Sequence, residues 1–312
     1  MTRNNNIQEY INMLGPIPKF LEKYLSLKIL TRLKKVGYFC GMDYASEHIY
    51  MFEYKISRYE HSLTTALLTW KHTKSKKQTL AALFHDVSTP CFSHVIDYMN
   101  KDYENQESTE EKTESILRSS KKLKELLKED KLTIEDVLDF KHYTIVDTHR
   151  PKLCADRIDG IILTSLGWTK SLSIQEIPYI LNSIKVMKNE DNEKELGVTT
   201  NEIANRLCDL NREIDIICHS NEDNYMMELL AEITKYAIDK EYITYDNLYE
   251  YNEEKLMKIL YSIEDTALKI LLNLFKTVTI EEISIKELPK LKRRYINPLV
   301  NGKRFITEQK NS

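Results

Sequence analysis

Glycine and proline, the residues that most often interrupt helices, are scarce in this sequence: 7 of each occur among 312 residues. Either residue weakens a helix interior, so long stretches without them are able to remain helical. Lysine, glutamate, leucine and isoleucine are abundant, which favours long helices joined by short connections. We therefore expect an all-α fold, and the length allows one large domain or two smaller ones.

Apolar residues recur at helical spacing in three segments. The first begins at Ser57 and carries Leu63, Ala66, Leu67 and Trp70. The second carries Leu80, Leu83 and Phe84, and Pro90 prevents its simple continuation, so a new helix is expected to start around Phe92. The most regular pattern alternates steps of four and three residues and predicts one continuous amphipathic helix through Leu256, Leu260, Ile263, Ala267, Ile270 and Leu274.

Other local patterns predict smaller features. The segments Gly37–Gly41 and His48–Tyr54 carry aromatic and β-branched residues on either side of a polar connection, which predicts a small β-hairpin. The polar stretch Lys188–Gly197 shows no periodicity and predicts a loop or a mobile insertion. Capping-box patterns predict further helix starts at Thr133 with Asp136, Thr199 with Glu202, and Thr279 with Glu282.

Charge and cysteine content exclude several classes of protein. The net charge of -3 gives no overall attraction to nucleic acid or to acidic membranes. The five cysteines form no CxxC pair, which argues against a disulfide framework and against a thiolate zinc site. No run approaches the ~18 apolar residues that a membrane span requires, and the first residues lack an apolar leader. We expect a soluble, cytoplasmic protein.

Four residues of metal-binding type lie in or beside the segments read as helical. They are His61, His85, Asp86 and Asp156. Imidazole and carboxylate groups suit divalent Zn, Fe, Mn and Co, and helices packed side by side are able to bring four such groups to one point. Each residue alone has an ordinary explanation, as a core histidine, a chance dipeptide or a helix cap. The four together are a candidate metal-binding group.

The sequence segments around these residues make that interpretation more specific. SRYEHSL, ALFHDVSTPCFSHVID and ADRIDG resemble the motifs of the HD superfamily of metal-dependent phosphohydrolases, in particular the branch of deoxynucleoside triphosphate triphosphohydrolases that includes the SAM-and-HD-domain enzymes. The resemblance covers about residues 32–162, with a weaker echo near the C-terminus. It implies an HD-domain helical core over residues 1–180 with a C-terminal helical extension over residues 181–312. It also implies one divalent ion, Mn, Fe, Zn, Co or Mg, held by His61, His85, Asp86 and Asp156.

The resemblance also assigns roles to neighbouring side chains. Arg58 and Arg157 match phosphate contacts, where cationic groups neutralise an anionic substrate; surface ion pairs are the alternative. His94 matches a catalytic histidine, and Asp97 follows it on the same helical face, where it is able to orient the imidazole. His94 is then the general acid for the leaving oxygen. The alternative is a histidine in the first turn of a helix with a carboxylate partner.

Three departures from the family pattern concern the substrate. A histidine of the family's turn is Thr89 here, and its later His-Glu pair is replaced by Glu110 and Glu111. A carboxylate near a polyphosphate repels it unless a proton or cation intervenes. Tyr38 stands where the family has a glutamine that contacts the sugar, and Gly160 replaces a tyrosine. Recognition of the sugar is therefore not carried over.

The leading hypothesis is a metal-dependent phosphohydrolase of nucleotides, with a deoxynucleoside triphosphate as the first substrate to test. A nucleoside monophosphate phosphatase or a phosphodiesterase is the alternative within the superfamily. A catalytically weak regulator that binds a nucleotide or nucleic acid is the alternative from another class. Such a protein could keep all four ligands for a structural metal, because metal binding also stabilises folding. The resemblance is compatible with a homo-oligomer. A basic run over residues 289–304 suits phosphate, a regulatory nucleotide or nucleic acid, or else forms a solvated tail or an oligomer contact.

Overall fold

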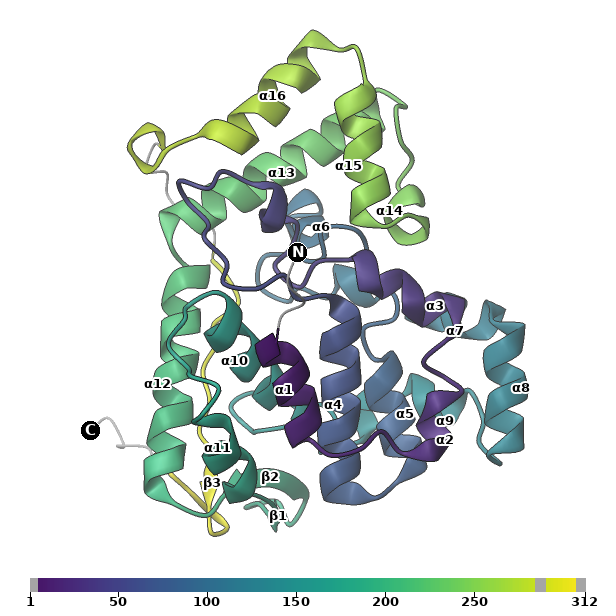
Figure 1. The fold of residues 1–312 in the computed structure, drawn as a ribbon, viewed down its shortest axis with the longest axis vertical. Coiled ribbons are helices and arrows are strands. Elements are labelled where there is room, and N and C mark those ends of the chain that lie inside the picture. Colours follow the sequence, from purple (N-terminus) through teal and green to yellow (C-terminus); the bar gives the residue numbers. More distant parts are fainter. Residues whose placement is uncertain (1–4, 284–289, 307–312) are drawn as a thin grey trace.

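The computed structural model describes residues 5–283 and 290–306; Pro289, the first residue of the predicted basic run, lies outside them. Helices dominate the described residues, as the composition predicted (Figure 1). None of the described helices combines the length and the apolar character that crossing a membrane requires. The α-helices are α1 Asn5–Met13, α2 Lys19–Glu22, α3 Lys28–Thr31, α4 Arg58–Thr73, α5 Lys76–Phe84, α6 Val95–Met99, α7 Thr113–Ser119, α8 Lys121–Glu129, α9 Glu135–Leu138, α10 Ala155–Gly167, α11 Ile177–Ser183, α12 Asn201–Cys218, α13 Asn221–Asp239, α14 Asn247–Glu250, α15 Glu253–Ser262 and α16 Thr266–Thr277.

Short elements connect these helices. The 3-10 helices are η1 Arg32–Lys35, η2 Met42–Tyr44, η3 Ser108–Glu110, η4 Phe140–His142 and η5 Ile280–Glu282. The strands are β1 Ile184–Lys188, β2 Lys194–Val198, β3 Leu299–Val300 and β4 Lys303–Arg304.

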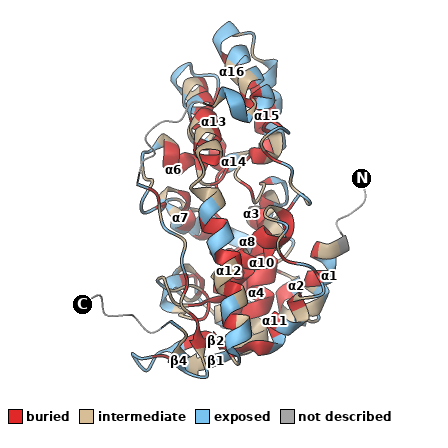
Figure 2. Ribbon diagram, turned by 90° about the vertical axis from the view of Figure 1, so that its left-hand side faces the viewer, coloured by how far each residue is buried: buried red, intermediate tan, exposed pale blue. Residues whose placement is uncertain are grey.

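Helix α4 is the central helix of the fold and packs against α5 and α10. It begins with a capping box, in which the Ser57 side chain accepts from the Glu60 backbone N–H and the Glu60 carboxylate accepts from the Ser57 N–H. The predicted face of this helix is buried at Leu63, Ala66 and Leu67. Figure 2 shows α4 and α10 as mostly buried, whereas α16 exposes much of its surface. Side chains on the first turns of α4 and α10 therefore meet inside the protein.

The predicted hairpin at residues 37–54 is wrong. This segment consists of turns and η2, and its backbone forms one bridge, from Gly37 to Ser57. The chain reverses direction at Cys40 and Gly41, whose φ angles are 56° and 77°, so it does not extend into a strand. Its aromatic residues form a cluster instead, in which the Phe39 and Phe52 rings stack at 4.3 Å. Aromatic residues here fill the core rather than build a sheet.

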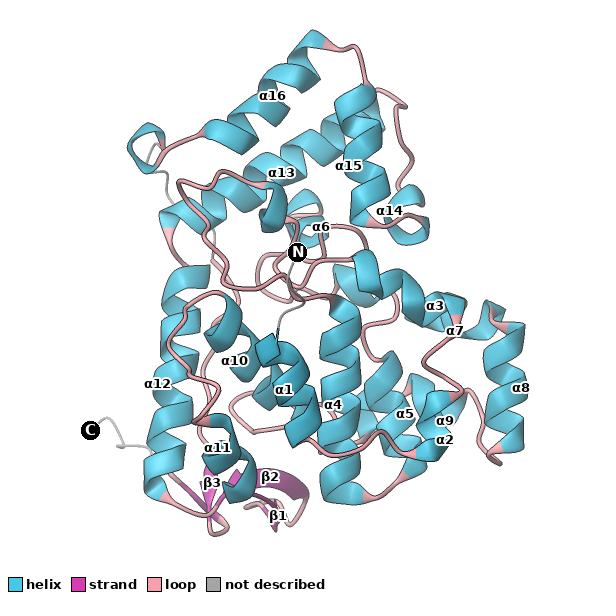
Figure 3. Cartoon of the chain, in the orientation of Figure 1, coloured by secondary structure: helices cyan, strands magenta, loops and turns pink. Residues whose placement is uncertain are grey.

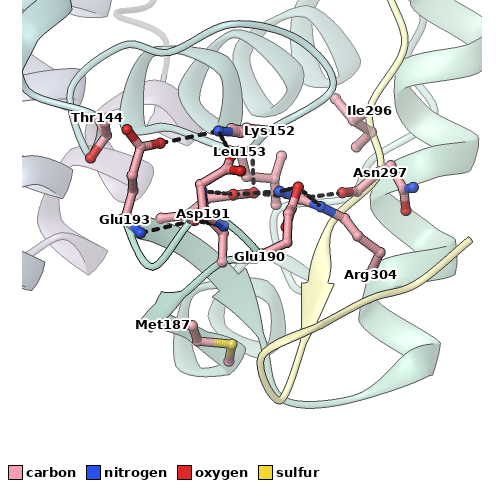
Figure 4. A network of polar contacts seen from close by, with 12 residues as sticks. Thr144, Lys152, Leu153, Met187, Glu190, Asp191, Glu193, Ile296, Asn297 and Arg304 are labelled. Carbon is pink, nitrogen blue, oxygen red and sulfur yellow. Dashed lines mark hydrogen bonds and ion pairs between the residues drawn. The ribbon is translucent and has the colours of Figure 1, made fainter.

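The sheet lies where the sequence predicted a loop. Strands β1 and β2 pair antiparallel around the polar stretch, β3 joins β2 in parallel and β4 pairs with β3 (Figure 3). The polar side chains find partners from elsewhere in the chain, as Figure 4 shows. Arg304 pairs with Glu190 at 3.0 Å and with the buried Glu195 at 2.6 Å, and Lys152 pairs with Asp191 at 3.0 Å. Contacts distant in sequence therefore stabilise this hairpin.

The late apolar pattern forms two helices rather than one. Helix α15 ends at Ser262, and α16 starts after Asp265, whose carboxylate caps it by accepting from the Leu268 N–H at 2.8 Å. The buried residues of α16 are Leu268, Leu272 and Phe275, whereas Ile270 is 62% exposed. An aspartate that caps a new helix interrupts the periodicity, because its side chain bonds to the backbone of the next turn.

The predicted caps are mostly in place. Thr133 and Asp136 exchange hydrogen bonds just before α9, and the Thr279–Glu282 capping box precedes η5. The third cap is wrong by one position, since Thr200 caps α12. The helix after Pro90 begins later than expected, at Val95.

Two hydrophobic clusters hold the fold together. The larger joins α4, α5 and α10 to α11, α12 and the sheet. The smaller joins α6 to the helices α13–α16, which Figure 1 shows at the end of the molecule away from the strands. Both clusters contain residues from either side of position 180. The division into residues 1–180 and 181–312 stays a prediction.

Candidate metal centre

The four predicted ligands converge between three helices. His61 lies on α4, His85 and Asp86 directly follow α5, and Asp156 lies in the first turn of α10. The Nε2 atom of His61 is 3.1 Å from Asp156 Oδ1 and 3.7 Å from Asp86 Oδ2. The Nε2 atom of His85 is 3.4 Å from Asp156 Oδ1 and 3.6 Å from Asp86 Oδ1. Two imidazoles and two carboxylates thus face one point.

The histidine rings are oriented with Nε2 toward this point. The Ala82 carbonyl accepts from His85 Nδ1 at 2.7 Å, which leaves the lone pair on Nε2. His85 Nε2 is buried and makes no hydrogen bond among the described residues. A buried polar atom without a partner is unusual in a native protein, and a bound ion is one accepted explanation. The donor set fits a divalent ion that takes nitrogen and oxygen ligands.

The charges of the cluster also favour a cation. Burial opposes a charge on His85, but the neighbouring Asp86 and Asp156 carboxylates raise its pKa to about 10. Burial likewise disfavours the charged form of Asp86, but His85, Arg58 and His61 lower its pKa to about 2. The carboxylates are therefore ionised and draw positive charge to the centre. A divalent ion bound there would supply that charge in place of protons on the histidines.

A further carboxylate, to which the sequence assigned no role, supports His61. Asp159 is fully buried and its Oδ2 accepts from His61 Nδ1 at 2.8 Å and from the Thr64 hydroxyl at 2.8 Å. Its Oδ1 accepts from the Tyr10 hydroxyl at 2.6 Å. Partners of this kind fix the tautomer of a metal-binding histidine. The sequence feature that could have identified Asp159 is its position three residues after Asp156, which places both on the same face of α10.

A second cluster of ligand atoms adjoins the first. Asp147, Cys154 and Asp156 place one such atom each within 4.8 Å of one another. The Cys154 thiol points toward Asp147 Oδ1 at 3.7 Å. Burial raises the pKa of this thiol to about 12, so it stays protonated at neutral pH. This group contains one thiol and no imidazole, so its ligand types differ from those of the first cluster.

The two predicted phosphate-binding arginines differ in their surroundings. Arg58 is buried beside the metal cluster, where Nη1 lies 3.0 Å from Asp86 Oδ2 and the guanidinium lies over the Tyr38 ring at 4.9 Å. Arg157 donates to the backbone carbonyls of Thr148 and Lys152. Arg58 therefore lies next to the proposed metal ligands, whereas Arg157 binds the backbone of the loop before α10.

His94 and Asp97 form the predicted pair. His94 Nδ1 donates to Asp97 Oδ2 at 2.8 Å, and the other Asp97 oxygen accepts from the Ser108 N–H at 3.1 Å. Asp97 is fully buried, while the His94 side chain is 27% exposed. The carboxylate fixes the proton on Nδ1 and leaves Nε2 of His94 available to a substrate.

One cavity of about 850 Å³ contains the metal cluster and His94. Of the predicted substrate contacts, Tyr38, Arg58, Glu110 and Arg157 line it. Glu110 is paired with Lys141 at 2.8 Å, which offsets its negative charge.

Two predicted contacts lie elsewhere. Thr89 is buried in the turn after Asp86, and its carbonyl accepts from Arg32. Glu111 accepts from the Tyr249 hydroxyl at 2.8 Å. The cavity also contains cationic residues to which the sequence assigned no individual role, namely Lys141, Arg150, Lys152, Lys292 and Arg294.

Comparison with known proteins agrees with this geometry. Residues 58–161 match the family model described as HD domain. Protein YdhJ of Bacillus subtilis, described as uncharacterized, is 33% identical over 111 residues, which cover 34% of this chain and 33% of that protein. Metal-dependent phosphohydrolase cns2 of Cordyceps militaris is 25% identical over 132 residues, which cover 42% of this chain and 37% of that protein.

The matches thus span about a third of the length of these relatives. The segment that matches the family model carries the four clustered ligands together with His94 and Asp97. Residues 58–161 are therefore similar in sequence to an HD domain.

Proposed function

We propose that this protein is a metal-dependent phosphohydrolase that acts on nucleotides, with deoxynucleoside triphosphates as the first substrates to test. The observation that carries the proposal is the placement of the His61, His85, Asp86 and Asp156 cluster and the His94–Asp97 pair in one cavity. The relative named as a metal-dependent phosphohydrolase supports the same chemistry.

The side chains divide the work of phosphoryl transfer. The four clustered residues would hold a divalent ion, which when bound would supply polarisation of a phosphoryl oxygen and activation of water at neutral pH. Arg58 adds positive charge beside this position, since its guanidinium lies 3.0 Å from Asp86. His94, oriented by Asp97, donates the Nε2 proton of its imidazolium form to the leaving oxygen and is left as the neutral imidazole with its proton on Nδ1. The roles of acid and charge neutralisation thus belong to different residues.

A nucleoside monophosphate or a phosphodiester is the second candidate substrate. Glu110 lines the cavity, and its carboxylate disfavours a long phosphate chain. The ion pair between Glu110 and Lys141 at 2.8 Å weakens that objection. Triphosphates therefore remain the first class to test.

Product analysis tests the proposal directly. The purified chain is incubated with individual dNTPs, NTPs and NMPs in Mn, Mg, Co or Fe, and the products are separated by chromatography. We expect release of phosphate, triphosphate or nucleoside by the wild type and loss of bound metal and turnover in His85→Ala. The exposed His48 provides the matched control, and His48→Ala is expected to retain both. Turnover by His85→Ala equal to that of the wild type contradicts the proposal.

A further inference from the structure

Five of the six cations in the basic run near the C-terminus fall into two groups according to their partners. One group is paired with carboxylates: Lys290 with Glu104 at 2.8 Å, Arg293 with Asp215 at 2.8 Å, and Arg304 with Glu190 and Glu195. The other group is Lys292 and Arg294, which line the cavity that contains the metal cluster. Alternate cations of one short segment thus have different surroundings.

Arg150, from the loop before α10, joins Lys292 and Arg294 in the cavity lining. Within residues 5–283 and 290–306, none of these three side chains forms an ion pair. Lys292 Nζ donates to the Asn105 carbonyl at 2.6 Å, Arg150 Nη1 to the Tyr295 carbonyl at 3.3 Å and Arg294 Nη2 to the Gln106 side chain at 3.3 Å. Their hydrogen-bond acceptors are therefore neutral.

This cluster, Arg150 with Lys292 and Arg294, retains unused hydrogen-bond donors. The Nε atom of Arg294 is buried and makes no hydrogen bond in the described part of the chain. Lys292 has three N–H donors and uses one of them for Asn105. A buried N–H without an acceptor destabilises the protein. Binding of an acceptor in the cavity recovers that free energy, because it satisfies the free donor.

Electrostatics point in the same direction. Burial lowers the pKa of Lys292, and the neighbouring Arg294 and Arg150 lower it further. Burial, together with the nearby Arg157 and Arg294, lowers the pKa of Arg150 to about 10. Mutual repulsion of this kind is relieved when an anion binds between the cations.

We propose that Arg150, Lys292 and Arg294 form an anion subsite for a second phosphoryl group of a substrate whose first phosphoryl group reaches the metal cluster. The subsite rests on the proposed function, because it needs a phosphorylated substrate in this cavity. It favours molecules with a phosphate chain over monoesters. It also accounts for Lys292 and Arg294, which lie outside the segment that matches the HD domain.

Binding of inorganic tripolyphosphate tests the subsite. Isothermal titration calorimetry compares tripolyphosphate with orthophosphate on the metal-loaded full chain at a fixed concentration of free Mn²⁺. The variants are Lys292→Gln, which removes a cavity cation, and Lys290→Gln, which removes the same charge two residues away. We expect Lys292→Gln to weaken tripolyphosphate binding about tenfold, because a charged hydrogen bond is lost. Lys290→Gln should bind tripolyphosphate with the affinity of the wild type. Orthophosphate should bind the wild type and both variants with equal affinity.

The outcomes separate this inference from the proposed function. Equal tripolyphosphate affinity in Lys292→Gln and Lys290→Gln overturns the subsite, even if nucleotides are hydrolysed. Absence of hydrolysis with every nucleotide overturns the proposed function, yet a selective loss in Lys292→Gln still supports anion binding by the cluster. Arg150→Gln is the second variant and should show the same selective loss if Lys292→Gln fails to fold, and wild-type affinity in it overturns the subsite.

Discussion

Replacement of Asp159 by asparagine tests whether this buried carboxylate orients the ring of His61, one of the four proposed metal ligands. Asp159 accepts from His61 Nδ1 and from the Thr64 hydroxyl with Oδ2, and from the Tyr10 hydroxyl with Oδ1. An asparagine oxygen still accepts at one of these positions, but its amide nitrogen only donates. An amide at Oδ2 opposes the proton on His61 Nδ1. His61 then moves that proton to Nε2, where it faces the ligands Asp86 and Asp156.

The expected magnitude follows from this change of tautomer. Loss of a partner that orients a metal-binding histidine typically weakens metal binding about 10- to 100-fold. That range corresponds to about 1.4–2.8 kcal/mol. Tyr10→Phe is the matched control, because it removes the bond to Oδ1 and leaves the 2.8 Å contact between Asp159 and His61. It should cost about 1 kcal/mol of stability with little effect on metal affinity.

The assay is competitive titration of Mn²⁺ or Zn²⁺ against a chromophoric chelator, with the free energy of unfolding measured in parallel by urea denaturation. Asp159→Asn should lower metal affinity more than its loss of stability accounts for. Wild-type metal affinity in Asp159→Asn refutes the reasoning. An equal loss of affinity in Tyr10→Phe also refutes it, since the effect is then structural rather than due to the His61 tautomer.

Two further predictions concern the acid and a buried carboxyl. His94→Gln should lower turnover about 10²- to 10⁴-fold with metal content unchanged, and Asp97→Asn should lower it less and shift the pH profile; full turnover in His94→Gln contradicts the role of acid. Burial raises the pKa of Glu253 to about 7, so the stability that its neutral form contributes is present below the usual carboxyl pKa and is lost as the pH rises through about 7. Glu253→Gln keeps an acceptor for the Phe92 N–H and should gain about 3 kcal/mol relative to the wild type between about pH 5 and about pH 8, as measured by urea denaturation; a pH-independent difference contradicts this assignment.

The ligand cluster follows from sequence because its members lie on regular helices. His61 lies on a helix with a recognisable cap, and His85 and Asp86 stand where the next helix ends. The position of Asp156 depends on the start of α10 and on its packing against α4. Local patterns indicate the helices next to His61, His85 and Asp86, and the motifs identify all four residues that the structure brings together.

Contacts between segments that are distant in sequence could not be predicted from local patterns. Tyr10 reaches Asp159 from α1, and Lys292 reaches the cavity from the segment after α16. The hairpin of β1 and β2 depends in the same way on Arg304, which pairs with the buried Glu195. Asp159 and Glu195 are buried carboxylates whose partners, Tyr10 and Arg304, lie more than a hundred positions away. Local periodicity contains no information about such partners.

The turn that carries the HD motif shows why these distant contacts matter for the chemistry. After Pro90 the chain passes through Phe92 and Ser93, whose φ angles of 65° and 47° are unfavourable for residues with a side chain. Residues from α14 and from the first turn of α15 hold this conformation. The Glu253 carboxylate accepts from the Phe92 N–H at 3.0 Å, and the Leu248 carbonyl accepts from the Cys91 N–H at 2.7 Å.

Arg32 holds the same turn from the other side through the Thr89 carbonyl. None of Arg32, Leu248 and Glu253 belongs to residues 58–161, the segment that matches the HD domain. The backbone that places His94 beside the metal cluster is therefore fixed by elements outside that segment. The four clustered residues specify the proposed metal site, but the position of His94, the proposed acid, depends on the N-terminal and C-terminal parts of the chain together.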